Sequence, residues 1–276
     1  MNTELPSIAI IGTGSMGGAI LAGLLGPAVT VSGGIRVTNR TAAKAAALAG
    51  PGVESLSIET DPHANRRAVK GAASVLIGVK PAMVVDALRE LADHLEPDAI
   101  VVSVAAGVTT ATMEAVVSQP VIRAMPNTPA VVGRAVTGIA GGSRASEADV
   151  ALAVRLFETV GATLVLDESR IDALSTISGS GPAYVFYLIE ELTRTAVDQG
   201  FTDEEAALMV SQTFLGAAEL LTASGEDPAE LRRRVTSPGG TTERAIQVFE
   251  AAELKSIFDR ATAAALARSK ELGAGV

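Results

Sequence analysis

The stretch Ile8-Ala-Ile-Ile-Gly-Thr-Gly-Ser-Met-Gly-Gly18 decides the fold of this chain. A short apolar run leads into a Gly-x-Gly-x-x-Gly motif, and apolar residues at helical spacing follow directly. This order is typical of a strand, turn and helix that bind a dinucleotide. Gly12 allows the tight turn, Gly14 allows close approach of a pyrophosphate, and Gly17 allows the helix to pack on the sheet. The alternative is a glycine-rich turn that binds nothing.

The N-terminus of this first helix is a second candidate feature. Its free N–H groups and positive dipole end favour phosphate, so we expect Ser15 and Met16 to contribute to cofactor binding together with the three glycines.

The composition excludes several classes of function. The chain has 276 residues, a formal net charge of −9, no cysteine and 2 histidines. The negative charge argues against nucleic-acid binding. Without cysteine there are no disulfides or thiolate sites, and two histidines exclude a histidine-rich metal site, so we expect no metal. The first residues lack signal-peptide features and no apolar stretch reaches the length of a membrane span, which predicts a soluble, cytoplasmic protein without a membrane partner.

The first half alternates short β-branched runs with alanine-rich helical runs, which predicts an α/β fold with a doubly wound parallel sheet. The expected strands are 8–11, 34–38, 74–79, 99–103, 121–124, 136–140 and 162–166. The expected helices are 16–25, 42–49, 81–92, 110–117 and 147–160. Several strands are apolar throughout, as expected for strands covered on both faces.

The second half contains no convincing strand after Asp167. Helical patterns occupy 168–178, 182–199, 203–224, 228–235, 241–251 and 253–272. We therefore expect a dinucleotide-binding domain at 1–167 and an all-helical domain at 168–276. Residues 182–223 carry more apolar surface than two helices can bury in each other, which predicts a homo-oligomer through this region. The alternative is that this surface packs only within its own chain.

The end of the second expected strand indicates the choice of nicotinamide cofactor. A carboxylate at this place selects NAD, whereas this strand ends in Asn39, Arg40 and Thr41. Arg40 is suited to the 2′-phosphate of NADP, and Asn39 and Thr41 are hydrogen-bond donors. We expect NADPH, with NADH as the alternative. The alternative is that Arg40 is an ordinary surface charge and that Thr41 only caps the next helix.

Several segments, in order along nearly the whole chain, resemble pyrroline-5-carboxylate reductase. They are Gly12–Gly17, Gly78–Pro81, Ser103–Val108, Arg123–Pro129, Ser178–Tyr184 and Val235–Thr242. The resemblance implies an oxidoreductase that transfers a hydride from NAD(P)H to the C=N carbon of 1-pyrroline-5-carboxylate, the last step of proline biosynthesis. It implies a Rossmann domain followed by a helical dimerisation domain, often in a ring of dimers, with the active site between one subunit's cofactor and helices of its partner.

The loop Ser237-Pro-Gly-Gly-Thr-Thr242 precedes an expected helix. Two adjacent glycines let backbone N–H groups converge, which makes a receptor for a carboxylate. The resemblance places Ser237, Gly239, Gly240 and Thr241 around the substrate, with the Thr242 hydroxyl facing the ring nitrogen as the catalytic candidate. A hydroxyl is a weak acid, so water or an already protonated iminium supplies the proton. The alternative is a plain turn and helix cap.

The remaining candidate cofactor contacts follow strands or rest on the resemblance. They are Asn65 near the adenosine ribose, Val79, Lys80 and Pro81, the small residues Ala105, Ala106 and Gly107 against the nicotinamide, and Asn127 near its carboxamide or a water. Lys80 is also a tempting proton donor, but the resemblance assigns its segment to the cofactor. Residues 178–182 interrupt a helical run. The interruption either brings backbone against a substrate pocket or serves helix packing alone.

Two other functions fit part of the pattern. A dehydrogenase of the β-hydroxyacid type has the same domain order but calls for a lysine on an interdomain helix, and no lysine lies between Lys80 and Lys255. A non-catalytic NADP-binding sensor has no need for the carboxylate-binding loop at 237–242.

Overall fold

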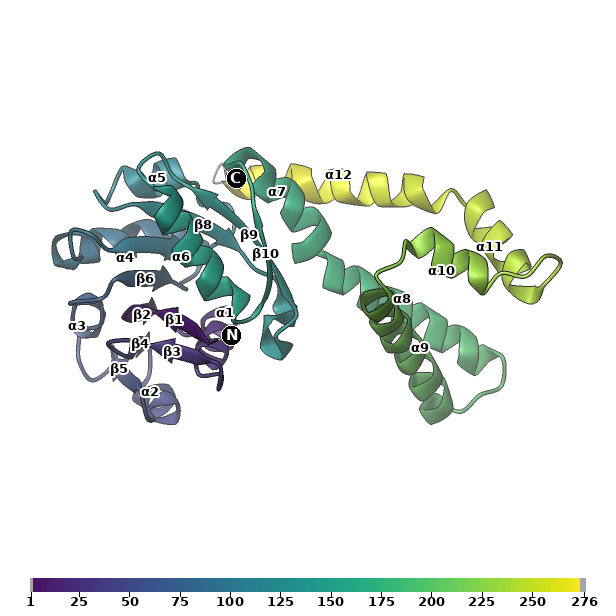
Figure 1. The fold of residues 1–276 in the computed structure, drawn as a ribbon, viewed down its shortest axis with the longest axis horizontal. Coiled ribbons are helices and arrows are strands. Elements are labelled where there is room, and N and C mark those ends of the chain that lie inside the picture. The colour runs from purple at the N-terminus through teal and green to yellow at the C-terminus, as the bar shows by residue number, and fades with distance from the viewer. Residues whose placement is uncertain (1, 274–276) are drawn as a thin grey trace. The chain divides into compact units, whose positions relative to one another are not determined.

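The computed structural model describes residues 2–273 (Figure 1). Contacts divide the chain into two compact units. The first comprises the residues up to Ser180 and those from Leu266 on, and the second is Gly181–Ala265. The predicted boundary, after residue 167, lies before the end of the first unit at Ser180. Residues 168–179 belong to the first unit because they pack on the sheet, where the Ile171 and Leu174 side chains lie against Gly138.

The first unit is built on an eight-stranded sheet in the order β10-β9-β8-β7-β6-β2-β4-β5. Its strands are β2 (Ile8–Ile11), β4 (Ile35–Asn39), β5 (Val53–Ser57), β6 (Ser74–Ile77), β7 (Ile100–Ser103), β8 (Val121–Met125), β9 (Ala135–Gly141) and β10 (Gly161–Val165). A small separate sheet pairs β1 (Thr3–Leu5) with β3 (Val29–Val31). Since β2 lies between β4 and β6, the predicted doubly wound arrangement is confirmed.

The prediction of a wholly parallel sheet needs one correction. Strands β8 and β9 run antiparallel, with Ala124 opposite Ile139. They are joined through the short helix η3 (Thr128–Val132), and a parallel crossover needs a connection of a dozen or more residues. The chain therefore turns back on itself after β8, and β10 then pairs parallel with β9.

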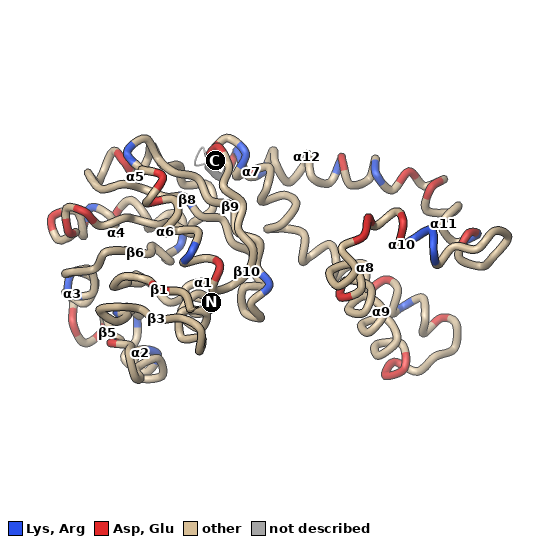
Figure 2. Tube along the Cα trace, viewed as in Figure 1, with Lys and Arg blue, Asp and Glu red and all other residues tan. Residues whose placement is uncertain are grey.

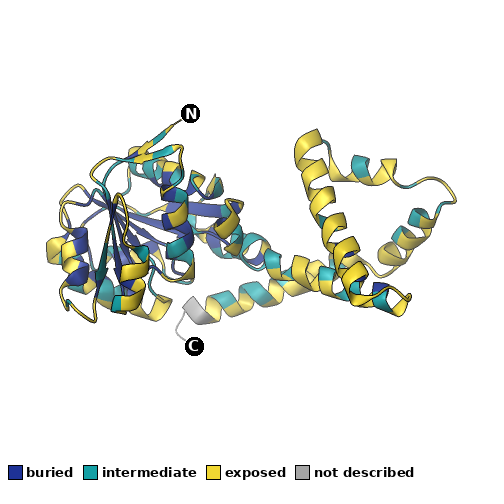
Figure 3. Ribbon diagram, turned by 90° about the horizontal axis from the view of Figure 1, so that it is seen from below, coloured by how far each residue is buried: buried dark blue, intermediate teal, exposed yellow. Residues whose placement is uncertain are grey.

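Helices cover both faces of this sheet. They are α1 (Ser15–Leu24), α2 (Ala42–Leu48), α3 (Ala64–Val69), η1 (Pro81–Met83), α4 (Val84–Leu91), η2 (Ala92–His94), α5 (Thr110–Glu114), α6 (Glu147–Glu158), η4 (Glu168–Arg170), α7 (Ile171–Leu174) and η5 (Ser175–Gly179), a π-helix. In β2, Ile8 and Ile10 join one buried cluster, whereas Ala9 and Ile11 join another. Because alternate residues of a strand point to opposite faces, the sheet has a core on each side (Figure 3).

The sequence patterns missed five elements of the first unit, namely β1, β3, β5, α3 and η3. β5 reads Val-Glu-Ser-Leu-Ser, lies at the sheet edge and exposes Glu54. α3 spans 6 residues and includes Arg66 and Arg67. Elements this short and polar carry too little periodicity to be recognised.

The second unit consists of helices α8 (Gly181–Asp198), α9 (Asp203–Ser224), α10 (Pro228–Arg234), α11 (Thr241–Ala251) and most of α12 (Leu254–Gly273). α8 packs on α9, yet the buried hydrophobic residues of the described part of this unit are only Ala196, Ala206 and Val210. Phe186 and Leu208 are 66% and 64% exposed. Figure 3 colours most of this helical unit as exposed. A single copy of the chain therefore leaves the apolar helical surface uncovered.

One of these helices corrects an expectation. By length and composition α9 is apolar enough to cross a membrane, although no stretch of that kind was expected. The same composition occurs in helices that pack on other helices, and α9 begins with the acidic triplet Asp203-Glu204-Glu205.

Candidate functional site

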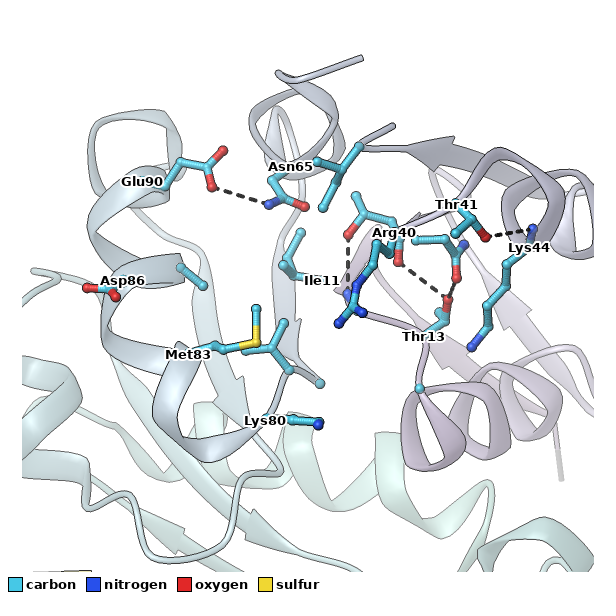
Figure 4. A pocket seen from close by; sticks show the side chains of 18 residues that line it. Ile11, Thr13, Arg40, Thr41, Lys44, Asn65, Lys80, Met83, Asp86 and Glu90 are labelled. Atoms are coloured by element: carbon cyan, nitrogen blue, oxygen red, sulfur yellow. Dashed lines mark hydrogen bonds between the residues drawn. The ribbon is translucent and has the colours of Figure 1, made fainter. Parts of the chain in front are cut away.

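A cavity of about 680 Å³ lies at the carboxyl ends of β2, β4 and β6 (Figure 4). This is where open α/β sheets bind ligands, and the volume suits a small-molecule site. Of the predicted cofactor residues, Gly12, Gly14, Asn39, Arg40, Asn65, Val79 and Lys80 line it. Ile11, Thr13, Thr38, Thr41, Lys44, Ile58, Gly78, Met83, Asp86, Ala87 and Glu90 complete the wall.

The glycine-rich turn has the geometry that its motif predicts. Gly12 has φ +87°, and a Cβ there would lie 2.9 Å from the Val79 side chain. A Cβ on Gly17 would lie 2.7 Å from the Gly12 carbonyl oxygen, so α1 packs against the turn too closely for any side chain. Gly14 is the N-cap of α1 and provides no side-chain cap. The first N–H groups of α1, on Ser15, Met16 and Gly17, are therefore available to an anion, although these residues do not line the cavity.

Two cations lie on the α2 side of the cavity, Arg40 and Lys44 (Figure 4). Both are exposed, and within residues 2–273 neither forms an ion pair. The Thr41 hydroxyl accepts from Lys44 N at 3.4 Å, so Thr41 caps α2 as expected. Lys44 was missed because a lysine inside an alanine-rich helix looks like a solvated charge.

Asn39 is bonded within the chain and also lines the cavity. Its side chain is buried, its Oδ1 accepts from the Thr13 hydroxyl, and its Nδ2 donates to Ser55 Oγ at 3.3 Å. The amide therefore holds β4 to its neighbours, and its predicted contact with the cofactor stays a prediction. Glu59 was also missed: its carboxylate accepts from Ala42 N at 2.7 Å, at the start of α2.

The opposite side of the cavity carries a buried acceptor without a partner. Asn65 is 9% exposed, and its Nδ2 donates to Glu90 Oε2 at 3.3 Å. Its Oδ1 is buried and accepts no hydrogen bond. A buried polar atom of this kind is costly unless a ligand or water satisfies it. A ribose hydroxyl is a donor of the kind that this oxygen lacks, so the residues present fit a dinucleotide.

The segment after β6 borders the same cavity in part. Lys80 lines the cavity, and Pro81 opens the short helix η1 at its first position without lining the cavity. The missing N–H of proline is not needed at a helix start. Val79 packs against the glycine turn and also lines the wall.

The predicted nicotinamide contacts lie outside this cavity wall. Ala105, Ala106 and Gly107 form the turn after β7, where Gly107 has φ +74°. Asn127 follows β8, but its Nδ2 donates to the Ser178 carbonyl at 2.9 Å and its Oδ1 accepts from Val136 N at 2.9 Å. These two bonds hold Asn127 in place after β8, and its predicted contact with a carboxamide or water stays a prediction.

A buried ionic cluster beside these turns was not predicted. The Arg123 side chain is 4% exposed and donates from Nη2 to Asp172 Oδ1 at 2.6 Å, while Nη1 lies 3.5 Å from Glu168 Oε1. Glu168 also accepts from Thr110 N at 2.7 Å and from the Thr110 hydroxyl at 2.6 Å. The cluster ties residues 168–172 to β8 and to the start of α5.

The five predicted substrate residues lie together in the second unit. Ser237, Gly239 and Gly240 form the turn before α11, and Thr241 and Thr242 are its first residues. Gly239 has φ +73°, and Gly240 N donates to the Ser237 carbonyl at 3.0 Å. No side chain caps α11, but Gly239 N donates to Glu243 Oε2 at 2.9 Å, a contact that the sequence pattern did not reveal.

Two family models match this chain. One is described as pyrroline-5-carboxylate reductase dimerisation and matches residues 168–272. The other is described as NADP oxidoreductase, coenzyme F420-dependent, and matches residues 7–107.

Relatives match over nearly the full length. A pyrroline-5-carboxylate reductase of Pseudomonas aeruginosa is 40% identical over 270 residues, 97% of each chain. One from Corynebacterium melassecola is 36% identical and covers 98% of this chain and 99% of the relative. The solved structure of a pyrroline-5-carboxylate reductase from Coxiella burnetii is 36% identical with a TM-score of 0.87, over 96% of this chain and 97% of that one. The fold is shared with the solved structure of a Plasmodium falciparum pyrroline carboxylate reductase with NADP bound. That chain is 23% identical with a TM-score of 0.80, over 97% of this chain and 98% of that one.

Proposed function

Because this chain belongs to the pyrroline-5-carboxylate reductase family, we propose that its first unit binds NADPH in the cavity beside β2 and that the loop 237–242 binds the substrate. The chain is an oxidoreductase that reduces 1-pyrroline-5-carboxylate to L-proline in proline biosynthesis. The observation that carries the cofactor site is the cavity that brings together the glycine turn, Arg40 and the unpartnered oxygen of Asn65.

Each residue group has a separate role in this proposal. Bound NADPH supplies the hydride that reduces the C=N carbon. The turn at Gly12–Gly17 and the start of α1 hold the pyrophosphate, and Asn65 accepts from a ribose hydroxyl. Val79, Lys80 and Pro81 border the cofactor on the β6 side, and Ala105–Gly107 leave room for a flat ring. With the reactants aligned, the reaction needs positioning more than a strong base.

Preference for NADPH over NADH rests on Arg40, with Lys44 as a second cation near the 2′-phosphate. A charge-assisted hydrogen bond contributes about 1.5–3 kcal/mol, or roughly 10- to 100-fold in affinity. We expect Arg40→Ala to raise the KM for NADPH by that factor and to change the KM for NADH little. The exposed Arg155 on α6 provides a control, Arg155→Ala. Equal weakening of both cofactors would remove the 2′-phosphate argument.

The loop 237–242 is proposed to bind the substrate carboxylate through backbone N–H groups, with the Thr242 hydroxyl on the ring nitrogen. Thr242→Ala should lower kcat with pyrroline-5-carboxylate about tenfold while the Kd for NADPH stays within twofold. The primary assay is the loss of NADPH absorbance with pyrroline-5-carboxylate. A protein that binds NADPH but shows no pyrroline-dependent oxidation refutes the assignment.

The match to a dimerisation model, together with the uncovered apolar helices, supports oligomerisation through the second half of the chain. We propose a homodimer through these helices, arranged further as a ring of dimers. The dimerisation model begins at residue 168, which supports domain limits of 1–167 and 168–276, although residues 168–179 pack on the sheet of the first unit. Basic residues are dispersed along the trace (Figure 2), and Arg233 and Arg234 of α10 pair with Glu230. This distribution argues against a nucleic-acid partner. We propose a cytoplasmic enzyme without a membrane partner. Light scattering after size exclusion measures the subunit number.

A further inference from the structure

The loop proposed to bind the substrate carboxylate already holds a carboxylate of its own chain. Gly239 N donates to Glu243 Oε2 at 2.9 Å. Glu243 lies in the first turn of α11, directly after Thr242, and is half-buried. A glutamate at this helix position usually reaches back to the N–H of the N-cap residue. Here Gly240 is the N-cap and its N–H donates to the Ser237 carbonyl, so Glu243 reaches one residue further, to Gly239.

We infer that Glu243 determines the affinity for the substrate by competing with its carboxylate for the Gly239 N–H. This inference rests on the proposed role of the loop. Two carboxylates repel each other at contact distance and one N–H group makes one strong bond, so an incoming carboxylate must displace the glutamate. The adjacent cation, Arg244, donates to Gln247 Oε1 at 3.2 Å further along the helix.

The competition predicts the direction in which the affinity for the substrate changes. A substrate that displaces a hydrogen bond to a charged acceptor binds more weakly than one that meets a free N–H, by about three- to tenfold at a partly exposed site. We expect Glu243→Gln and Glu243→Ala to lower the KM for pyrroline-5-carboxylate by this factor, with the larger effect in Glu243→Ala, and to leave kcat within twofold. Glu250→Gln is the matched control, since it removes the same charge from an exposed position of the same helix.

A pair of ring compounds separates carboxylate competition from a general effect on the loop. In the NADPH-bound enzyme, the Kd of cyclopentanecarboxylate by calorimetry should fall with the KM in both variants, whereas that of neutral cyclopentanecarboxamide should not. A raised KM in the variants, or equal changes in Kd for the two compounds, overturns the inference, because Glu243 then organises the loop. An unchanged KM also overturns it, because Glu243 then has no effect on substrate binding. Wild-type enzyme without pyrroline-dependent NADPH oxidation instead refutes the proposed function, and the calorimetric pair still tests Glu243.

Discussion

Replacing Arg123 by methionine should destabilise the first unit strongly. The guanidinium lies between Asp172, at 2.6 Å, and Glu168, at 3.5 Å, and its side chain is 4% exposed. Arg123→Met fills most of the volume but leaves two partly buried carboxylates without their cation. Breaking a buried ion pair in this way costs about 3–5 kcal/mol. The Glu168 and Asp172 side chains remain 26% and 30% exposed, so the lower end of that range, about 3 kcal/mol, applies.

Thermal unfolding followed by circular dichroism measures this loss. At about 2–4 °C per kcal/mol for a unit of this size, the Tm should fall by about 6–12 °C. Arg155→Met, at an exposed position of α6, is the control. Arg123 does not line the cavity beside β2, so the Kd for NADPH well below the transition should change less than twofold. The triple variant Arg123→Met/Glu168→Gln/Asp172→Asn should recover much of the Tm, because no uncompensated charge remains. A fall no larger than that of Arg155→Met would refute the reasoning.

Three further variants test the cofactor site and the assembly. Gly17→Ala places a Cβ 2.7 Å from the Gly12 carbonyl oxygen, so the turn must shift. The Kd for NADPH, measured by NADPH fluorescence, should therefore rise about tenfold, while the helical circular dichroism should stay unchanged. Asn65→Leu removes the unpartnered acceptor and should raise the same Kd roughly five- to tenfold; an unchanged value would show that the ribose does not use it. Leu208→Glu puts a charge on the uncovered helical surface, so light scattering should report smaller oligomers, whereas Leu25→Glu in the first unit should not alter the mass.

The helical half was predictable in detail because its boundaries are encoded locally. Helix α9 begins and ends where the sequence predicts: Thr202 and Glu205 form a reciprocal capping box, and Gly225 ends the helix with φ +64°. Pro228 likewise begins α10 at a position where its missing N–H costs nothing. Such signals lie within a few residues of the boundary that they determine, so no tertiary information is needed.

Asn39 and Asn127 show what residue type alone leaves out. Each lies at the end of a strand of the sheet, the place at which a ligand binds, and each amide is predicted to contact the cofactor. Both side chains are buried and also bonded to the protein itself, Asn39 to Thr13 and Asn127 to the Ser178 carbonyl. Asn65 has the reverse character, since its Oδ1 lacks a partner. The difference depends on which neighbours the fold brings near, and no pattern around these residues encodes it.

Long-range pairs are the part of the site that sequence alone cannot supply. Arg123 interrupts the apolar run Val121–Met125, and a buried arginine requires an acidic partner. That partner is Asp172, 49 positions away, and the choice among the acidic residues of the chain depends on how α7 returns to the sheet. The same return allows the Ser178 carbonyl, within the π-helix η5, to accept from Asn127. Ligand-facing groups such as the glycine turn lie in short motifs because a ligand needs several adjacent N–H groups at once. The groups that hold those motifs in place come from distant parts of the chain, so no short pattern in the sequence reveals them.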